Sequence, residues 1–130
     1  MGQSHEKLFP IFLTGKVVHG KGLGRTVAMP TANLCPEQKE LPEEGVYASY
    51  IMVGERRLRA VTNVGTRPSV DQENVPTIES HILDFDENIY GQRVELELVQ
   101  YLRPIRKFAG LDEVWEQVKK DIKEAKKILT

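Results

Sequence analysis

The C-terminal end of the chain carries the clearest pattern of apolar positions. Between Leu111 and Leu129 apolar residues recur mostly at steps of three and four, and the stretch contains neither glycine nor proline. Such spacing gathers the apolar side chains on one side of an α-helix, where they can face a core. Acidic residues stand in the first turns and lysines follow, which matches the helix dipole at each end. The pattern predicts an amphipathic helix over about residues 111–129 whose lysines form a solvated face.

Upstream of this helix the apolar period changes to two. Between Arg93 and Leu102 apolar residues alternate with charged and polar ones, which is typical of a half-buried antiparallel strand. Two further runs flank the turn-like sequence Gly54-Glu55-Arg56-Arg57 and predict a hairpin. The remaining predicted strands are short and separated by turn-rich segments. Besides the strand at residues 93–102, the predicted strands are, in chain order, Lys16–His19, Tyr47–Val53, Leu58–Val64 and Thr77–Phe85.

These elements favour a mainly β fold. No strand–helix–strand alternation is present, so a doubly wound parallel sheet is disfavoured, and a small antiparallel barrel with one C-terminal helix packed on it fits better. The length of 130 residues suits one compact domain. We expect that domain to span residues 9–130, with residues 1–8 as a flexible N-terminal arm.

Composition narrows the class of function. Lysine and arginine total 18 against 19 acidic residues, a net charge of -1, so no basic surplus supports broad nucleic-acid binding. The N-terminus does not resemble an export signal, and nowhere do apolar residues run long enough to span a membrane. The single cysteine, Cys35, cannot form an internal disulfide and is more simply a small buried residue than a nucleophile. A cytoplasmic protein without nucleic-acid or membrane partners is expected.

The first candidate for chemistry is the loop Gly20-Lys21-Gly22-Leu23-Gly24-Arg25, which follows a predicted strand. Its alternate glycines let backbone N–H groups approach an anion closely, and Lys21 and Arg25 add positive charge. The loop is neither a Walker A sequence nor a dinucleotide fingerprint, because no helix is predicted after it. A glycine-rich barrel turn explains it equally well.

The second candidate is Pro30-Thr31-Ala32-Asn33. In an extended chain Thr31 and Asn33 point to the same side, and a hydroxyl with an amide oxygen is a ligand pair suited to magnesium. Since neither group is charged, such a site would need nucleotide phosphates to complete the coordination of the ion. The alternative is a turn shaped by hydrogen bonds from these side chains to the backbone.

The third candidate is Glu79, within the predicted strand Thr77–Phe85. Alternation places it on the same side as Leu83 and Phe85, so its carboxylate could act as a general base on a partly apolar face. The opposite face carries Ile78 and Ile82, and this stretch does not decide which face points inward. A solvated glutamate on a barrel strand is the simpler interpretation.

Taken together and in order, these segments resemble riboflavin kinase, a family that phosphorylates the ribityl 5′-hydroxyl of riboflavin with ATP to give FMN. The resemblance runs from about Gly15 to Leu129, and Pro-Thr-Ala-Asn is its most specific part. Besides the glycine-rich loop and that run, the matching segments are Gly45-Val46-Tyr47-Ala48, Asn63-Val64-Gly65-Thr66-Arg67-Pro68, Glu79-Ser80-His81-Ile82-Leu83-Asp84-Phe85, Tyr90-Gly91, Leu102-Arg103-Pro104 and Lys107-Phe108. The family's fold is a Greek-key barrel of six antiparallel strands with a C-terminal helix, as the periodicity suggests.

The resemblance also implies roles for individual residues. Glu79 would be the catalytic base, and Thr31 and Asn33 would hold the Mg²⁺ of Mg-ATP. The remaining sites are for nucleotide and flavin, with ATP as co-substrate and riboflavin and FMN as substrate and product. The implied nucleotide-binding residues are Gly20, Gly22, Gly24, Arg25 and Tyr90, and the implied flavin-binding residues are Arg103, Arg106 and Phe108.

Two departures from the family pattern qualify this picture. Ala28-Met29 stand where a glycine and a bulky apolar residue are usual, and Ile105 stands where a glutamate is expected, which leaves the flavin-side loop without a carboxylate. A flavin- or nucleotide-binding barrel without catalysis is therefore the alternative. We expect a monomer that binds small molecules. It is either a monofunctional kinase or the C-terminal part of a longer protein that carries an FMN adenylyltransferase domain.

Overall fold

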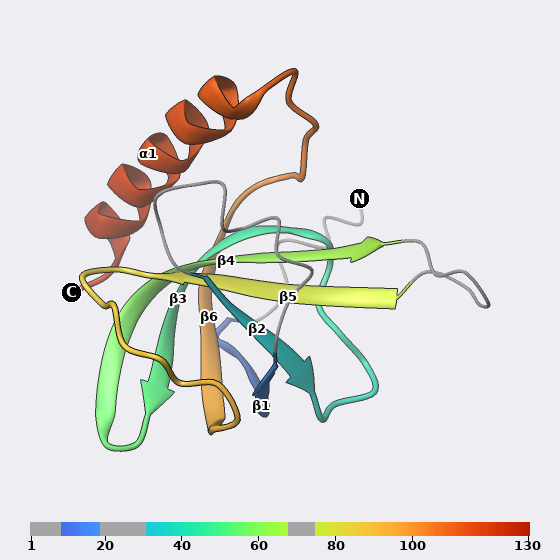
Figure 1. Cartoon of the computed structure of the whole chain (residues 1–130), viewed down its shortest axis with the longest axis vertical. Coiled ribbons are helices and arrows are strands. Elements are labelled where there is room, and N and C mark those ends of the chain that lie inside the picture. Colours follow the sequence, from blue (N-terminus) through green and yellow to red (C-terminus); the bar gives the residue numbers. More distant parts are fainter. Residues whose placement is uncertain (1–8, 19–30, 68–74) are drawn as a thin grey trace.

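In the part of the chain that the structure describes, six antiparallel strands and one C-terminal helix make up the fold (Figure 1). The computed structural model describes residues 9–18, 31–67 and 75–130. Within these ranges no helix is both long enough and apolar enough to cross a membrane. The elements are β1 (Ile11–Val18), β2 (Thr31–Pro36), β3 (Gly45–Val53), β4 (Arg56–Arg67), β5 (Val75–Ile82), β6 (Arg93–Arg103) and α1 (Leu111–Ile128).

The strands close into a barrel in the order β1-β2-β5-β4-β3-β6. Every neighbouring pair is antiparallel, including the pairs β2–β5, β3–β6 and β1–β6, which join strands that are not consecutive in the chain. Closure leaves no strand of the sheet with an unpaired edge. The predicted antiparallel barrel with a C-terminal helix is confirmed.

Several predicted boundaries were wrong. β1 starts at Ile11 rather than Lys16, and Thr31–Pro36 forms a strand that was not among the predicted ones. The β3–β4 hairpin has the short loop Gly54-Glu55, with Gly54 at φ 62°, a conformation that glycine adopts at little cost.

The end of β5 and the burial of the cysteine also differ from expectation. β5 stops at Ile82, and Asp84 has φ 54°, so the chain turns before Phe85, which packs against the barrel core instead of sharing a face with Glu79. Cys35 is exposed. Its neighbours along β2 explain this, because the inward positions of that strand are taken by Ala32 and Leu34.

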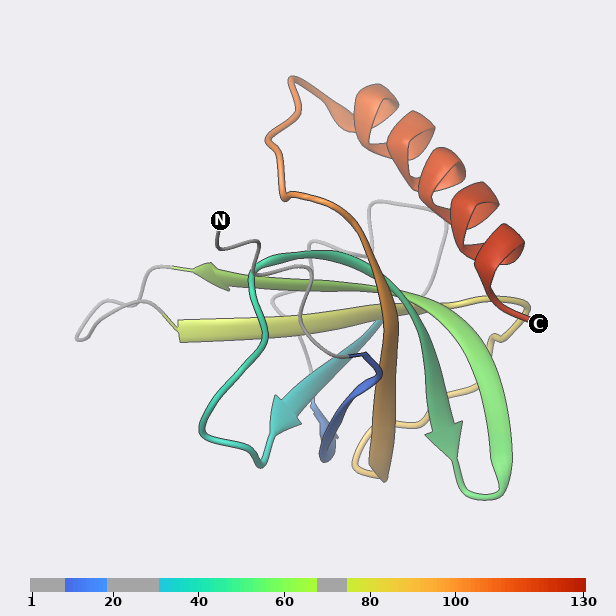
Figure 2. The same ribbon diagram turned by 180° about the vertical axis from the view of Figure 1, so that it is seen from behind.

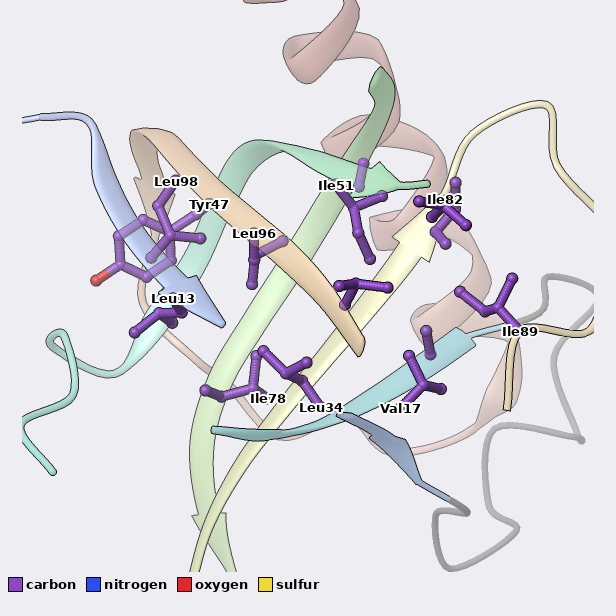
Figure 3. Packing of buried hydrophobic residues seen from close by; sticks show 14 of the residues in the cluster. Leu13, Val17, Leu34, Tyr47, Ile51, Ile78, Ile82, Ile89, Leu96 and Leu98 are labelled. Carbon is purple, nitrogen blue, oxygen red and sulfur yellow. The ribbon is translucent and has the colours of Figure 1, made fainter. Parts of the chain in front are cut away.

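The barrel interior holds a cluster of buried apolar side chains (Figure 3). Tyr47, Ile78 and Leu96 are among its fully buried side chains. A row of three hydrogen-bonded side-chain hydroxyl groups crosses this core. The Ser49 and Thr62 hydroxyls are 2.7 Å apart, and Thr62 lies 2.8 Å from the Ser80 hydroxyl, so these polar groups satisfy one another across β3, β4 and β5.

Helix α1 packs on the outside of the barrel through its C-terminal half. Ala125 and Leu129 join a second buried cluster with residues of β3 and β4 such as Val46, Ala48 and Val61. The helix was predicted to end at residue 129, and it ends at Ile128 with Leu129 as its C-cap. Figure 2 shows that the first turns of α1 stand farther from the strands than its last turns do.

Candidate active site

Glu79 lies on the outer face of the barrel between two asparagines. It is in register with Asn33 of β2 on one side and with Asn63 of β4 on the other. Residues directly opposite one another in an antiparallel sheet point to the same face. In the next row of the same face, Thr31 is in register with His81. The structure thus brings Thr31, Asn33 and Glu79 together, as the resemblance implied, although they come from segments more than forty residues apart in the sequence.

The row that contains Glu79 continues around the barrel in both directions. On one side it reaches Val18, the last residue of β1 before the glycine-rich loop. On the other side it reaches the C-terminal end of β6, where the connection to α1 begins. Glu79 therefore lies between the end of β1 and the end of β6. In order, the row is Val18, Asn33, Glu79, Asn63, Val46 and Arg103.

A cavity of about 370 Å³ opens beside this row, between the barrel and the first two-thirds of α1. Its barrel wall is formed by Thr31, Val61, Asn63, Glu79 and His81. The opposite wall is mostly apolar and is formed by Phe108, Leu111, Val114, Val118 and Ile122, with the polar side chains of Arg103, Gln117 and Asp121. One polar wall facing one apolar wall suits a ligand with a polar chain and a flat apolar ring.

The polar residues of the second wall form one hydrogen-bonded group. Arg103 donates to both carboxylate oxygens of Asp121, from Nε and from a terminal nitrogen, at 2.8 Å each. Gln117 donates to the same carboxylate at 3.0 Å. Arg106, outside the cavity lining, reaches Gln117 at 3.4 Å and lies 4.9 Å from the centre of the Phe108 ring. The implied flavin-binding residues are thereby tied to the helix.

His81 is the most buried titratable residue of the barrel wall. It is 8% exposed, and its Nδ1 has no hydrogen-bond partner among the described residues. Burial lowers the pKa of this imidazole below its ordinary value, and the nearby Glu79 and Asp121 carboxylates oppose that shift. Burial therefore favours the neutral form of the ring, next to the carboxylate that is the candidate base.

The remaining predicted site residues lie elsewhere. Gly20, Gly22, Gly24 and Arg25 fall outside the described residues. Tyr90 is exposed on the β5–β6 loop, and it does not line the cavity. Its loop is nevertheless fixed beside the end of β1, because the next residue donates a backbone hydrogen bond to Val17 at 2.8 Å. Ile105 is exposed and is also absent from the cavity lining.

Sequence reasoning missed several residues of the cavity. Asn63, His81, Gln117 and Asp121 were given no role, although all four line it. Asn63 opens one of the segments that resemble the family, but its position next to Glu79 depends on the register between β4 and β5 and could not be predicted. Asp121 left a usable signal: it occupies a position that continues the apolar side of the helix, where a carboxylate is costly to bury.

Comparison with known proteins places the chain in a family. The model of the family described as "Flavokinase: Riboflavin kinase" matches residues 7–129. A bifunctional riboflavin kinase/FMN adenylyltransferase from Escherichia coli (strain K12) is 39% identical over 113 residues, which cover 86% of this chain and 36% of that protein. The chain therefore belongs to the riboflavin kinase family, which confirms the family predicted from the sequence motifs.

Solved structures agree on the fold. A chain described as a macrolide-efflux protein from Streptococcus pneumoniae matches with a TM-score of 0.84 and 32% identity, over 90% of this chain and 38% of that chain. Riboflavin kinase from Trypanosoma brucei matches with a TM-score of 0.62 and 20% identity, over 95% of this chain and 82% of that chain. The second likeness concerns the fold alone. The chain spans little more than a third of the E. coli relative, 36% of its length.

Proposed function

We propose that this chain transfers the terminal phosphoryl group of Mg-ATP to the ribityl 5′-hydroxyl of riboflavin, giving FMN and ADP. Membership of the riboflavin kinase family supports the reaction. The observation that carries it is the position of Glu79 in the barrel wall of the cavity, in register with Asn33 and beside Thr31 and His81. A carboxylate is thus available between the candidate metal ligands and a cavity large enough for an organic acceptor.

Glu79 acts as the general base. Its carboxylate accepts the proton of the 5′-hydroxyl while the hydroxyl oxygen forms a bond to the γ-phosphorus and the bond from that phosphorus to the bridging oxygen of ADP breaks. Phosphoryl transfer depends mainly on positioning and charge neutralisation. The protein therefore has to hold the hydroxyl against Glu79, and the polar side chains of Asn63 and His81 on the same wall are placed to orient the polyol chain.

Thr31 and Asn33 fit a Mg²⁺ that arrives with the nucleotide. Both offer uncharged oxygen atoms on one face of β2, two residues apart. Bound there, the ion would neutralise phosphate charge. In the sequence the glycine-rich loop follows β1, and Val18, the last residue of that strand, is in register with Asn33.

The second wall is suited to the isoalloxazine ring. Phe108 and the apolar residues of α1 provide a surface on which a flat ring can be buried, and Arg103 adds N–H donors at its edge. The exposed Ile105 does not contribute to this wall. The glutamate expected at position 105 is missing, but this wall still contains a carboxylate, because α1 supplies Asp121.

The wider setting is also a proposal. We place the reaction in the cytoplasm, where both substrates are small molecules, and we assign no nucleic-acid or membrane partner. Relatives such as the E. coli protein carry an adenylyltransferase activity in the same chain, and the present chain covers 36% of that length. The kinase described here would be monomeric, either alone or as one domain of such a protein.

The test is a product assay. The chain is incubated with riboflavin and Mg-ATP, and FMN and ADP are separated by chromatography. Equal amounts of FMN and ADP, dependent on Mg²⁺, are expected. Riboflavin that binds, as a change in its fluorescence shows, without any FMN would instead indicate a binding barrel without catalysis, and would reject the proposal.

A further inference from the structure

Asp121 stands out among the residues of α1. It is 6% exposed, whereas the other acidic residues of the helix are exposed. It lies on the row formed by Val114, Val118 and Ala125, at steps of four, three and four, where every other residue is apolar. A buried carboxylate loses hydration, and an apolar residue at this position would pack without that cost. Packing alone therefore does not account for an aspartate here.

The contacts of Asp121 show what the carboxylate does. Its two oxygens accept parallel hydrogen bonds from Nε and one terminal nitrogen of Arg103, each 2.8 Å long. This paired geometry fixes the plane of the guanidinium group as well as its position. The other terminal nitrogen donates to the Pro104 carbonyl at 2.9 Å. Gln117 adds a hydrogen bond to the carboxylate at 3.0 Å, which holds Asp121 in turn.

The orientation of Arg103 matters because of where it lies. Arg103 ends β6 and lines the cavity, at the end of the register row that includes Glu79. Its contacts with the described residues use one N–H of each terminal nitrogen, and each of these nitrogens carries a second. Hydrogen-bond donors held rigidly in this way lose little conformational entropy when a ligand binds.

We propose that Asp121 is a positioning residue for the acceptor: it holds the Arg103 guanidinium in the cavity wall so that the remaining N–H groups bind carbonyl oxygens of the flavin ring. The inference rests on the proposed riboflavin kinase activity and names the pair that recognises the ring. Asp121 itself need not touch the acceptor. If the ion pair only pinned the helix to β6, its loss would lower stability and leave the affinity of the folded protein for riboflavin unchanged.

The test is Asp121→Asn, which keeps the size of the side chain and removes its charge. We expect the KM for riboflavin to rise about tenfold, as for the loss of a charged hydrogen-bonding partner, with the KM for ATP and the kcat changed less than about twofold. Glu124→Gln is the matched control: it also removes a carboxylate from α1, but the side chain is exposed and its partner among the described residues is Lys127. The control should match the parent in all three constants.

A second set of variants tests whether the effect passes through Arg103. Arg103→Lys should raise the riboflavin KM by itself, and adding Asp121→Asn to it should raise the KM by less than about twofold more. Asp121→Glu should recover part of the lost affinity. If Asp121→Asn fails to fold, the Asp121→Glu and Arg103→Lys variants carry the test, and an unchanged KM in both overturns the proposal.

Failure of this inference can be told from failure of the proposed function. If the parent makes no FMN, the kinase assignment fails, and riboflavin binding measured by its fluorescence still compares the parent with Asp121→Asn. A dissociation constant about tenfold higher in the variant supports the positioning role. Asp121→Asn with a lower melting temperature but the parent's riboflavin affinity contradicts it.

Discussion

The two halves of the amphipathic helix α1 have different surroundings: one packs on the barrel and the other lines the cavity. In the C-terminal half, Ala125 is fully buried and Leu129 nearly so, within a cluster that covers the outside of β3 and β4. In the N-terminal half, Val114 and Val118 line the cavity and Leu111 is 56% exposed. The same apolar stripe thus seals a core at one end and forms a ligand wall at the other.

This difference shows what periodicity reports. Apolar residues at helical spacing indicate that one side of the helix is shielded from water. They do not show whether the rest of the protein or a bound ligand shields it. Substitutions at the two ends should therefore separate into effects on stability and effects on substrate affinity.

The largest predicted effect is on kcat, for a substitution of Glu79 in the cavity wall opposite the helix. Glu79→Gln removes the base and keeps the size of the side chain, so we expect kcat to fall about a hundred- to ten-thousandfold. Single-turnover phosphorylation of riboflavin, measured alongside a thermal melt, is the appropriate assay. Glu95→Gln, an exposed glutamate of β6 that does not line the cavity, is the control and should match the parent. An unchanged single-turnover rate for Glu79→Gln would remove Glu79 from the role.

The packed end of α1 should respond in stability. Leu129 is 4% exposed, and Leu129→Ala leaves a hole in the cluster under the helix, at a cost of about 2–5 kcal/mol in the free energy of unfolding. Urea unfolding measures this cost. At a temperature where the variant is folded, its KM for riboflavin should equal that of the parent, and a raised KM would show that the two ends of the helix are not separable.

The candidate metal ligands should give a smaller effect. Asn33→Ala removes one amide oxygen beside Glu79, and we expect the Mg²⁺ concentration for half-maximal rate to rise about tenfold, the scale of one lost polar contact. Cys35→Ser, two residues along the same strand and exposed, is the control. Superimposable magnesium titrations of Asn33→Ala and the parent would count against the ligand assignment.

A substitution at the cavity end of the helix should have a modest effect, on riboflavin binding and not on stability. Leu111→Ala shortens an exposed apolar side chain, so the free energy of unfolding should change by less than about 0.5 kcal/mol. If a flavin ring covers Leu111, the KM for riboflavin should rise about threefold through lost apolar contact. A stability loss as large as that of Leu129→Ala would show that both ends are packed alike.

The smallest predicted effect is a pH-dependent change in melting temperature, for a substitution of Glu37, which does not line the cavity. Hydrogen bonds from Arg93 and then Thr14 lower the pKa of Glu37 from 4.5 to about 2. Because the folded protein depresses this pKa, the stabilisation is present above pH 4.5 and is lost as the pH falls toward 2. The melting temperature of Glu37→Gln should thus lie slightly below the parent's at neutral pH and approach it on acidification. A difference that grows at low pH would contradict this.

The sequence predicted the fold well because most elements have one buried side; β3, which is buried on both faces, is the exception. Helix α1 and strand β6 were predicted nearly to their ends, since their apolar residues follow one period throughout. Strand β2 was not predicted, because the alternation of Thr31 to Leu34 is short and its polar residues also favour turns.

The site was predictable only in part. The motifs placed Thr31, Asn33 and Glu79 together correctly, but the proximity of Asn63 follows from strand register and that of Asp121 from how the helix lies on the barrel. Neither can be obtained from local pattern. The roles of the glycine-rich loop and of Tyr90 in nucleotide binding stay predictions.

A crystal structure of the chain with Mg-ADP and riboflavin would test the account most directly. We expect the flavin ring between the barrel and the first half of α1, against Phe108, with the 5′-hydroxyl within hydrogen-bonding distance of the Glu79 carboxylate. Riboflavin bound outside the cavity, or with its polyol chain directed away from Glu79, would contradict the account.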